Sequence, residues 1–236
     1  MTQSIVVFGA GPGVGRALAR RYGKAGYDVV LVARRAAPLE EFASALATDG
    51  TKAHVLPADL SETSRIPALA TRIRALVGDP AVVYYAPSPA DPDFIPAVSL
   101  TAARLHELMP LTLDSLIAVV GEFLPAMLGR GDGAILTAQG AAAVTGRAGM
   151  SGWPPLLAAQ RNYLQALAAE VADRGVFVGQ LHIGARITGT PFDEHYRASG
   201  RPDAAFPAAD PADLADLLWT MHADRRPLEK VVPDRW

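Results

Sequence analysis

A glycine-rich turn near the amino terminus is the part of the sequence that points most directly to chemistry. An apolar run at residues 4–8 leads into the heptapeptide GAGPGVG at 9–15, and residues 14–24 have the spacing of a helix. Glycines let backbone N–H groups approach a diphosphate, and the helix N-terminus adds unpaired amides and its dipole. The strand–turn–helix setting predicts a nucleotide site rather than an empty turn. The expected contacts are Gly9, Gly11, Gly13, Val14 and Gly15.

Two arginines follow the next apolar run. Residues 29–33 are predicted to form a second strand, and Arg34 and Arg35 come directly after it. A carboxylate at this place would repel a phosphate on the adenosine ribose, whereas guanidinium groups form charge-assisted forks with one. We therefore expect NADP(H) rather than NAD(H). The alternative is a pair of solvated arginines at a strand end.

With glycines at 9, 13 and 15, the chain resembles the short-chain dehydrogenase/reductase family over nearly its whole length. The family opens with T-G-x-x-x-G-x-G, and Phe8 stands here in place of the threonine. Its members contact the adenine after the third strand, border the cofactor after the fourth, and meet the carboxamide and phosphates in the loop after the sixth. The further cofactor contacts that this resemblance implies are Asp59, Leu60, Ala86, Ile187 and Thr188.

The acid–base residues of that family are missing. Family members use a Ser, a Tyr as proton donor or acceptor, a Lys four residues later that lowers the pKa of the Tyr, and a helix Asn. The strand at 133–140 aligns Gly140 with the Ser. A separate frame through the following helix aligns Trp153 with the Tyr and Leu157 with the Lys, and Thr112 falls at the Asn. The two frames agree, because the separation of positions 140 and 153 is the usual one in the family.

No shift of register restores the missing set, because none of the six tyrosines has Lys four places later. Trp153 and Leu157 lie four apart on one helix and should form an apolar wall at the nicotinamide end. The alternative is that this face packs into the core or a neighbouring subunit. Tyr84 and Tyr85 end the fourth predicted strand, where open α/β sheets bind ligands, and are weak candidates for a proton donor.

The histidines do not indicate a metal centre. The five His include no i, i+4 pair and no grouping with carboxylates at ligand spacing, and the chain has no Cys, so we expect no metal site. His182 is interpreted as structural. His195 and Tyr196 fall in an expected substrate lid at 185–207. They are interpreted as lid packing or exposed helix residues, and the alternative is that the lid brings them to the site as acid–base groups.

The elements that must position these residues alternate along all 236 residues. Apolar runs lie at 4–8, 29–33, 53–56, 81–85, 134–138 and 176–181, and helical stretches lie at 14–24, 39–47, 66–77, 113–128 and 156–173. This alternation predicts an α/β fold, with a Rossmann-type doubly wound parallel sheet, helices on both faces and a single domain over 1–236. The proline-rich stretch at 87–92 is predicted to be a loop.

Composition limits the partners. Half of the residues are hydrophobic, which predicts a folded chain, and a net charge of −2 argues against nucleic acid as the main partner. No apolar run approaches the ~18 residues of a membrane span, and no basic region precedes the first strand as in a signal peptide. We therefore expect a cytoplasmic protein that does not bind a membrane. The family resemblance implies a homodimer or homotetramer formed through the helices at 113–128 and 156–173.

Two classes of function remain open. The first is an NADP(H)-dependent oxidoreductase that acts on an activated C=C, C=N or C=O bond of a small-molecule substrate with a non-standard proton donor; an isomerase, cyclase or lyase on the same scaffold is a neighbouring possibility. The second is a catalytically inactive NADP-binding sensor or partner subunit. Retention of the cofactor residues beside loss of the acid–base set favours the enzyme.

Overall fold

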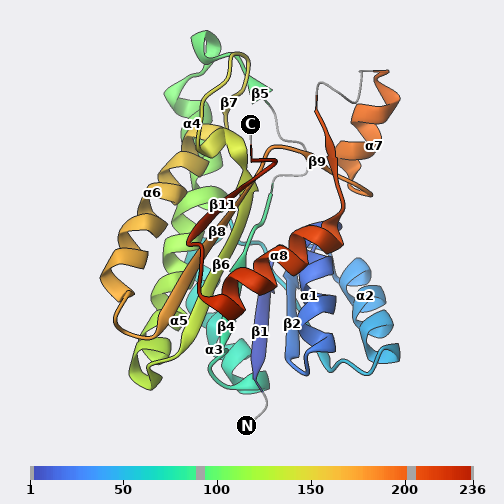
Figure 1. Cartoon of the computed structure of the whole chain (residues 1–236), viewed down its shortest axis with the longest axis vertical. Helices are drawn as coiled ribbons and strands as arrows, with labels where there is room; N and C mark the ends of the chain where they lie inside the picture. Colours follow the sequence, from blue (N-terminus) through green and yellow to red (C-terminus); the bar gives the residue numbers. More distant parts are fainter. Residues whose placement is uncertain (1–2, 89–93, 201–205, 235–236) are drawn as a thin grey trace.

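A seven-stranded parallel sheet forms the centre of the computed structural model, which describes residues 3–88, 94–200 and 206–234 (Figure 1). The strands are β1 (Ser4–Phe8), β2 (Asp28–Ala33), β3 (Ala53–Pro57), β4 (Val82–Tyr85), β6 (Gly133–Gly140), β8 (Val176–Ile183) and β11 (Glu229–Val232). Their order is β11-β8-β6-β4-β1-β2-β3, so β1 is internal and the chain winds away from it in both directions. The predicted doubly wound sheet is confirmed, and the carboxyl end of β1 lies at the point where such sheets bind ligands.

Helices cover both faces of the sheet. On one face lie α1 (Val14–Lys24), α2 (Ala36–Thr48) and α8 (Pro211–Asp224), and on the other lie α3 (Ile66–Val77), α5 (Ser115–Arg130) and α6 (Pro154–Val171). Successive residues of a strand point to opposite faces, so Val7 enters the core under α1 whereas Val6 enters the core under α5. Both faces are covered, which explains why the strand sequences are apolar throughout instead of alternating.

Several elements are not evident in the sequence pattern. They are α4 (Ala102–Met109), α7 (Pro191–Ala198), α8, β11, and two short ribbons in which β5 (Phe94–Ile95) pairs with β7 (Ser151–Gly152) and β9 (Arg186–Ile187) pairs with β10 (Ala208–Ala209). Single helical turns lie at Thr63–Arg65, Ala97–Ser99 and Ala141–Ala143. β11 escapes prediction because it is a partly exposed edge strand that begins with two charged residues. Most of the expected loop at 87–92 lies outside the described residues.

One helical stretch corrects the expectation about apolar length. Helix α4, a π-helical turn at Pro110–Asp114 and α5 form a continuous run from Ala102 to Arg130 whose mean hydropathy reaches 1.6, long and apolar enough for a membrane span by those criteria. It is the one such helix among the described residues, and 39% of the apolar window is buried. Helix α5 places Leu116, Val119 and Phe123 in the core against the sheet, whereas α4 has no buried residue.

Candidate functional site

The glycine-rich turn is held between two other segments of the site. Gly9 and Gly13 have φ angles of 95° and 102°, which side-chain-bearing residues rarely adopt. A Cβ atom on Gly9 would lie 2.7 Å from the backbone of Ala86, just after β4, and one on Gly13 would lie 2.9 Å from the Thr190 methyl group. Helix α1 has no side-chain cap and no acidic residue in its first turn. Its N-terminal amides therefore remain available to an anion.

Arg34 and Asp59 meet at a corner beside this turn. They follow β2 and β3, which are neighbours in the sheet, with Ala33 paired to Pro57. The Asp59 carboxylate accepts hydrogen bonds from the Ser61 hydroxyl at 2.6 Å and the Ser61 amide at 2.9 Å. These bonds, and more weakly the nearby Arg34, lower the pKa of Asp59. Arg34 and Arg35 are both exposed, and within the described part of the chain neither forms an ion pair.

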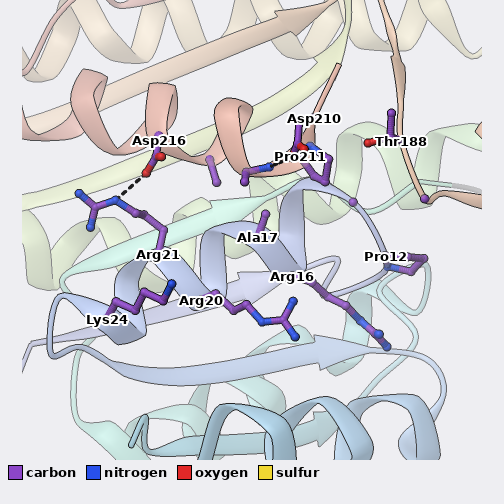
Figure 2. A pocket seen from close by; sticks show the side chains of 14 residues that line it. Pro12, Arg16, Ala17, Arg20, Arg21, Lys24, Thr188, Asp210, Pro211 and Asp216 are labelled. Carbon is purple, nitrogen blue, oxygen red and sulfur yellow. Dashed lines mark hydrogen bonds and ion pairs between the residues drawn. The ribbon is translucent and has the colours of Figure 1, made fainter. Parts of the chain in front are cut away.

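A groove starts at the glycine-rich turn at 9–15, called the phosphate turn below, and continues along α1 (Figure 2). Its volume is about 490 Å³, and its walls are the outer face of α1, the first turns of α8, and the loop after β9 with Thr188 and Gly189. Arg21 reaches across to Asp216 on α8 at 2.8 Å, whereas Arg20 and Lys24 have no carboxylate partner among the described residues. The structure thus brings Gly13 and Thr188 to one cavity with a basic lining.

Gly140, Trp153 and Leu157 come together at the other end of the site. Gly140 ends β6, and Trp153 immediately precedes α6. The Leu157 amide donates to the Trp153 carbonyl at 3.3 Å, which places both on one side of the helix. A Cβ atom on Gly140 would lie 3.7 Å from Leu157 Cδ1, an ordinary contact, and Leu157 is buried. An aliphatic side chain therefore faces the glycine.

The Trp153 indole is hydrogen-bonded to Thr112. Its Nε1–H donates to Thr112 Oγ1 at 3.0 Å, and the Thr112 hydroxyl donates to the Leu108 carbonyl at 2.8 Å. The Gln160 side-chain amide donates to the Thr112 carbonyl. Trp153 has a single N–H, so its hydrogen-bonding capacity is used within the protein. None of Thr112, Gly140, Trp153 and Leu157 carries a group that can deliver a proton near neutral pH.

Tyr84 and Tyr85 are closed off from the strand ends, each with 1% of its surface exposed. Tyr84 lies in the core under α1, and the Tyr85 hydroxyl donates to the Leu111 carbonyl at 2.6 Å and contacts Ser115. Burial raises the pKa of both hydroxyls. These placements do not favour either phenol as a proton donor.

The expected lid contains a buried ion pair. Arg186 pairs with Asp193 of α7, donates to the Phe206 carbonyl at 3.0 Å and lies over the Tyr196 ring at 5.2 Å. Tyr196 is buried and packs within the lid, whereas His195 is exposed. Residues 201–205 of the expected segment at 185–207 lie outside the described residues.

A largely buried polar cluster lies behind Gly140 and is not evident from the sequence pattern. It consists of Gln139, Arg161, Gln180, His182 and Glu229. The signal in the sequence is weak: two polar residues, Gln180 and His182, interrupt an otherwise apolar strand.

Comparison with known proteins decides the family. The model of the family described as short chain dehydrogenase matches residues 3–198. The chain belongs to the short-chain dehydrogenase/reductase family. It is thus an NAD(P)-binding protein of an oxidoreductase family.

Relatives of this short-chain dehydrogenase/reductase are distant. A fatty acyl-CoA reductase of Acinetobacter baylyi is 26% identical over 90% of this chain and 70% of its own length. A dehydrogenase/reductase SDR family protein 7-like of Drosophila melanogaster is 30% identical over 74% of this chain, which spans only 54% of that relative.

Solved structures share the fold at low identity. A metagenomic short-chain oxidoreductase in complex with NADP is 22% identical with a TM-score of 0.79, over 98% of this chain and 97% of that one. A short chain oxidoreductase from Pseudomonas aeruginosa PAO1, described as containing an atypical catalytic center, is 19% identical with a TM-score of 0.85, over 99% and 96% of the two chains. At these identities the likeness establishes the sheet and its layers.

Proposed function

We propose that this protein is an NADP(H)-dependent oxidoreductase that reduces an activated C=C, C=N or C=O bond without the family's Tyr–Lys pair. The observation that carries the proposal is the hydrogen bond from Trp153 to Thr112, beside Leu157 packed toward Gly140. Together they replace the acid–base set with an apolar wall whose one N–H is already bonded. The Pseudomonas structure described as having an atypical catalytic center supports the idea that this fold accommodates such a change.

The choice of NADP(H) rests on the corner beside the phosphate turn. Arg34 and Arg35 are exposed there without an ion-pair partner in the described chain, and Asp59 is held by Ser61 rather than by either arginine. The 2′-phosphate on the adenosine ribose of NADP(H) could bind these two guanidinium groups, because guanidinium groups form charge-assisted hydrogen bonds with phosphates. The metagenomic relative bound to NADP has the same fold.

The apolar wall limits the substrates that can react. NADPH supplies a hydride when bound, and the protein contributes position and electrostatics. A simple ketone would then become an alkoxide with no acid near it, whereas an iminium ion already carries its proton and an enone forms a delocalised enolate that water can protonate. Since general acid catalysis contributes about 10²–10⁴-fold, simple ketones should be reduced at least that much more slowly than by an ordinary family member.

Loss of NADPH absorbance with matched substrates tests the proposal. We expect turnover with cyclic imines or enones, little or none with unactivated ketones, and retention of the activity in Trp153→Phe. Fast reduction of unactivated ketones by the wild-type protein would refute the mechanism. Tight binding of NADPH without turnover on any activated substrate would instead favour the inactive NADP-binding sensor.

A gain-of-function variant provides the complementary test. Gly140 has φ −63° and ψ 140°, which any residue can adopt, and its added Cβ would make only an ordinary contact with Leu157 Cδ1 at 3.7 Å. We expect Gly140→Ser combined with Trp153→Tyr and Leu157→Lys to acquire ketone reduction, provided that circular dichroism shows a folded protein. A folded triple variant that reduces ketones no faster than wild type would show that these positions do not correspond to the family's.

Two features of assembly and closure belong to the same proposal. We propose that residues 185–207 form a lid held by Arg186 and Asp193, and that the single domain associates as a homodimer or homotetramer through α5 and α6. Both helices leave apolar or small residues exposed, Ile117 and Ala158 among them. Light scattering that showed a monomer at micromolar concentration would contradict the proposed assembly.

A further inference from the structure

The polar cluster behind Gly140 connects the end of β6 to the edge strand β11. Gln139 Nε2 lies 3.4 Å from His182 Nδ1, and His182 Nε2 lies 3.5 Å from Glu229 Oε2. Arg161 of α6 pairs with the same carboxylate oxygen at 2.8 Å, and Gln180 Nε2 donates to the other at 3.3 Å. His182 is fully buried, whereas the side chains of Glu229 and Arg161 are 23% and 28% exposed. The cluster therefore runs from solvent to the layer beneath the site.

His182 can change its charge within this cluster. An amide donor at Nδ1 assigns the proton of the neutral ring to Nε2, which faces Glu229. Burial lowers the pKa of His182, the Glu229 carboxylate opposes that effect, and Arg161 adds to it. His182 Nε2 and Gln139 Oε1 are buried without a hydrogen-bond partner in the described structure. A second ring proton would be taken up at Nδ1, where rotation of the Gln139 amide brings the unpartnered Oε1 in as its acceptor, and Glu229 is the counter-ion of the protonated ring.

His182 lies one residue before the sheet pair of Gly140 and Ile183, at the end of the site that is proposed to hold the nicotinamide. In the sheet, Gln139 pairs with His182, and Gly140 pairs with Ile183. The residue after Gln139 is therefore the glycine that faces Leu157, and the chain beyond Ile183 continues into the loop with Thr188. No other titratable side chain faces His182 from the described parts of α6, β6, β8 and β11 than Arg161 and Glu229.

We propose that His182 is a proton-binding site coupled to the oxidation state of the bound dinucleotide, protonated more readily beside NADPH than beside NADP⁺. The inference rests on the proposed NADP(H) binding. Oxidised nicotinamide carries a positive charge and dihydronicotinamide carries none, so a protonated His182 is repelled only by the oxidised ring. By linkage, acid must weaken the binding of NADP⁺ relative to NADPH.

The ratio of the two dissociation constants is the quantity to measure. Titrations with NADP⁺ and NADPH at about pH 8 and about pH 5 compare the two dissociation constants above and below the ordinary histidine pKa of about 6.5, from which burial lowers the pKa of His182. Protonation of the 2′-phosphate affects both cofactors alike and cancels in the ratio. We expect Kd(NADP⁺)/Kd(NADPH) to rise on the order of three- to tenfold at the lower pH, as expected for two charges within one site.

Three variants identify the responsible group. His182→Asn keeps an acceptor for Gln139 but cannot take up a proton, so the rise should disappear. Glu229→Gln removes the counter-ion, so the rise should move to lower pH; this variant also serves if His182→Asn does not fold. His222→Gln removes a partly buried histidine that bonds to Tyr22 in the α1–α8 contact, and should leave the rise intact.

The outcomes separate this inference from the function on which it rests. Failure of both cofactors to bind at either pH would refute the proposed function and this inference together. Binding with a ratio that does not change with pH, or a rise that persists in His182→Asn, would overturn the coupling and leave NADP(H) binding in place.

Discussion

The hydrogen bond between Trp153 and Thr112 predicts what Trp153→Phe will do. The substitution keeps an aromatic wall but removes the indole N–H that donates to Thr112 Oγ1 at 3.0 Å. A typical hydrogen bond contributes about 0.5–1.5 kcal/mol net, and the Thr112 hydroxyl retains its own bond to Leu108. For a chain of this length about 1 kcal/mol corresponds to 2–4 °C in Tm. We therefore expect a small loss of stability with no change in NADPH affinity or in turnover of an activated substrate.

A double-mutant cycle isolates that bond from the loss of ring volume. Thr112→Val removes the acceptor and leaves the indole N–H and the Leu108 carbonyl without their partner, which should cost about 1–3 kcal/mol in the free energy of unfolding. Measured by urea unfolding, the coupling between the two substitutions should be about 0.5–1.5 kcal/mol. Gly146→Ala, at an exposed position with no neighbour within 4 Å, is the control for sample preparation.

The opposite pattern would refute the reasoning. If the Trp153 N–H serves a bound ligand, Trp153→Phe will lower NADPH affinity or turnover, its stability will match wild type, and its coupling to Thr112→Val will be near zero. That outcome would show that the Trp153 N–H donates a hydrogen bond to the bound ligand instead of to Thr112.

Three further predictions follow from other parts of the structure. The wild-type protein should prefer NADP(H) over NAD(H) by about tenfold or more, because a charge-assisted hydrogen bond contributes about 1.5–3 kcal/mol, and Arg34→Ala should abolish this preference. Equal affinity of the wild-type protein for both cofactors in calorimetry would contradict the prediction. Gly9→Ala should destabilise the fold by at least about 1 kcal/mol and weaken nucleotide binding, because φ is 95° and the added Cβ meets backbone. Gly146→Ala, where no neighbour lies within 4 Å, should do neither. Burial lowers the pKa of His182 and His222, so the unfolded chain binds more protons than the folded chain below about pH 6.5. The free energy of unfolding should therefore fall as the pH decreases from there, by at most about 1.4 kcal/mol per pH unit for each histidine. A free energy of unfolding in urea that stays constant between about pH 7 and about pH 5 would show that neither histidine is held neutral.

Much of the fold could be predicted from the sequence because local and global signals agree there. The limits of β1, α1 and α3 coincide with the apolar runs and periodic stretches at 4–8, 14–24 and 66–77. A strand covered on both faces must be apolar throughout, and a helix on a sheet must be amphipathic, so each pattern has one interpretation. The same reasoning fails for β11, because Glu229 and Lys230 at a partly exposed edge look like surface residues until a partner strand is known.

The sequence by itself also predicts which residues occupy the family's acid–base positions. The assignment of Gly140, Trp153 and Leu157 rests on spacing alone and stays a prediction. The residue types at these positions can be read without coordinates. The phosphate turn can be recognised from its glycines, because residues other than glycine rarely adopt a positive φ.

Only the tertiary structure decided how these residues are bonded. Trp153 and Thr112 are 41 positions apart, and nothing in the sequence pairs an indole with a particular hydroxyl until the π-helical turn before α5 meets the start of α6. Tyr84 and Tyr85 end a strand at the right edge of the sheet, yet burial on opposite faces closes both off. His182 and Glu229 meet because β11 returns to pair with β8. Contacts of this kind depend on how segments that are distant in the sequence pack together, and local sequence patterns do not specify which distant residues will meet.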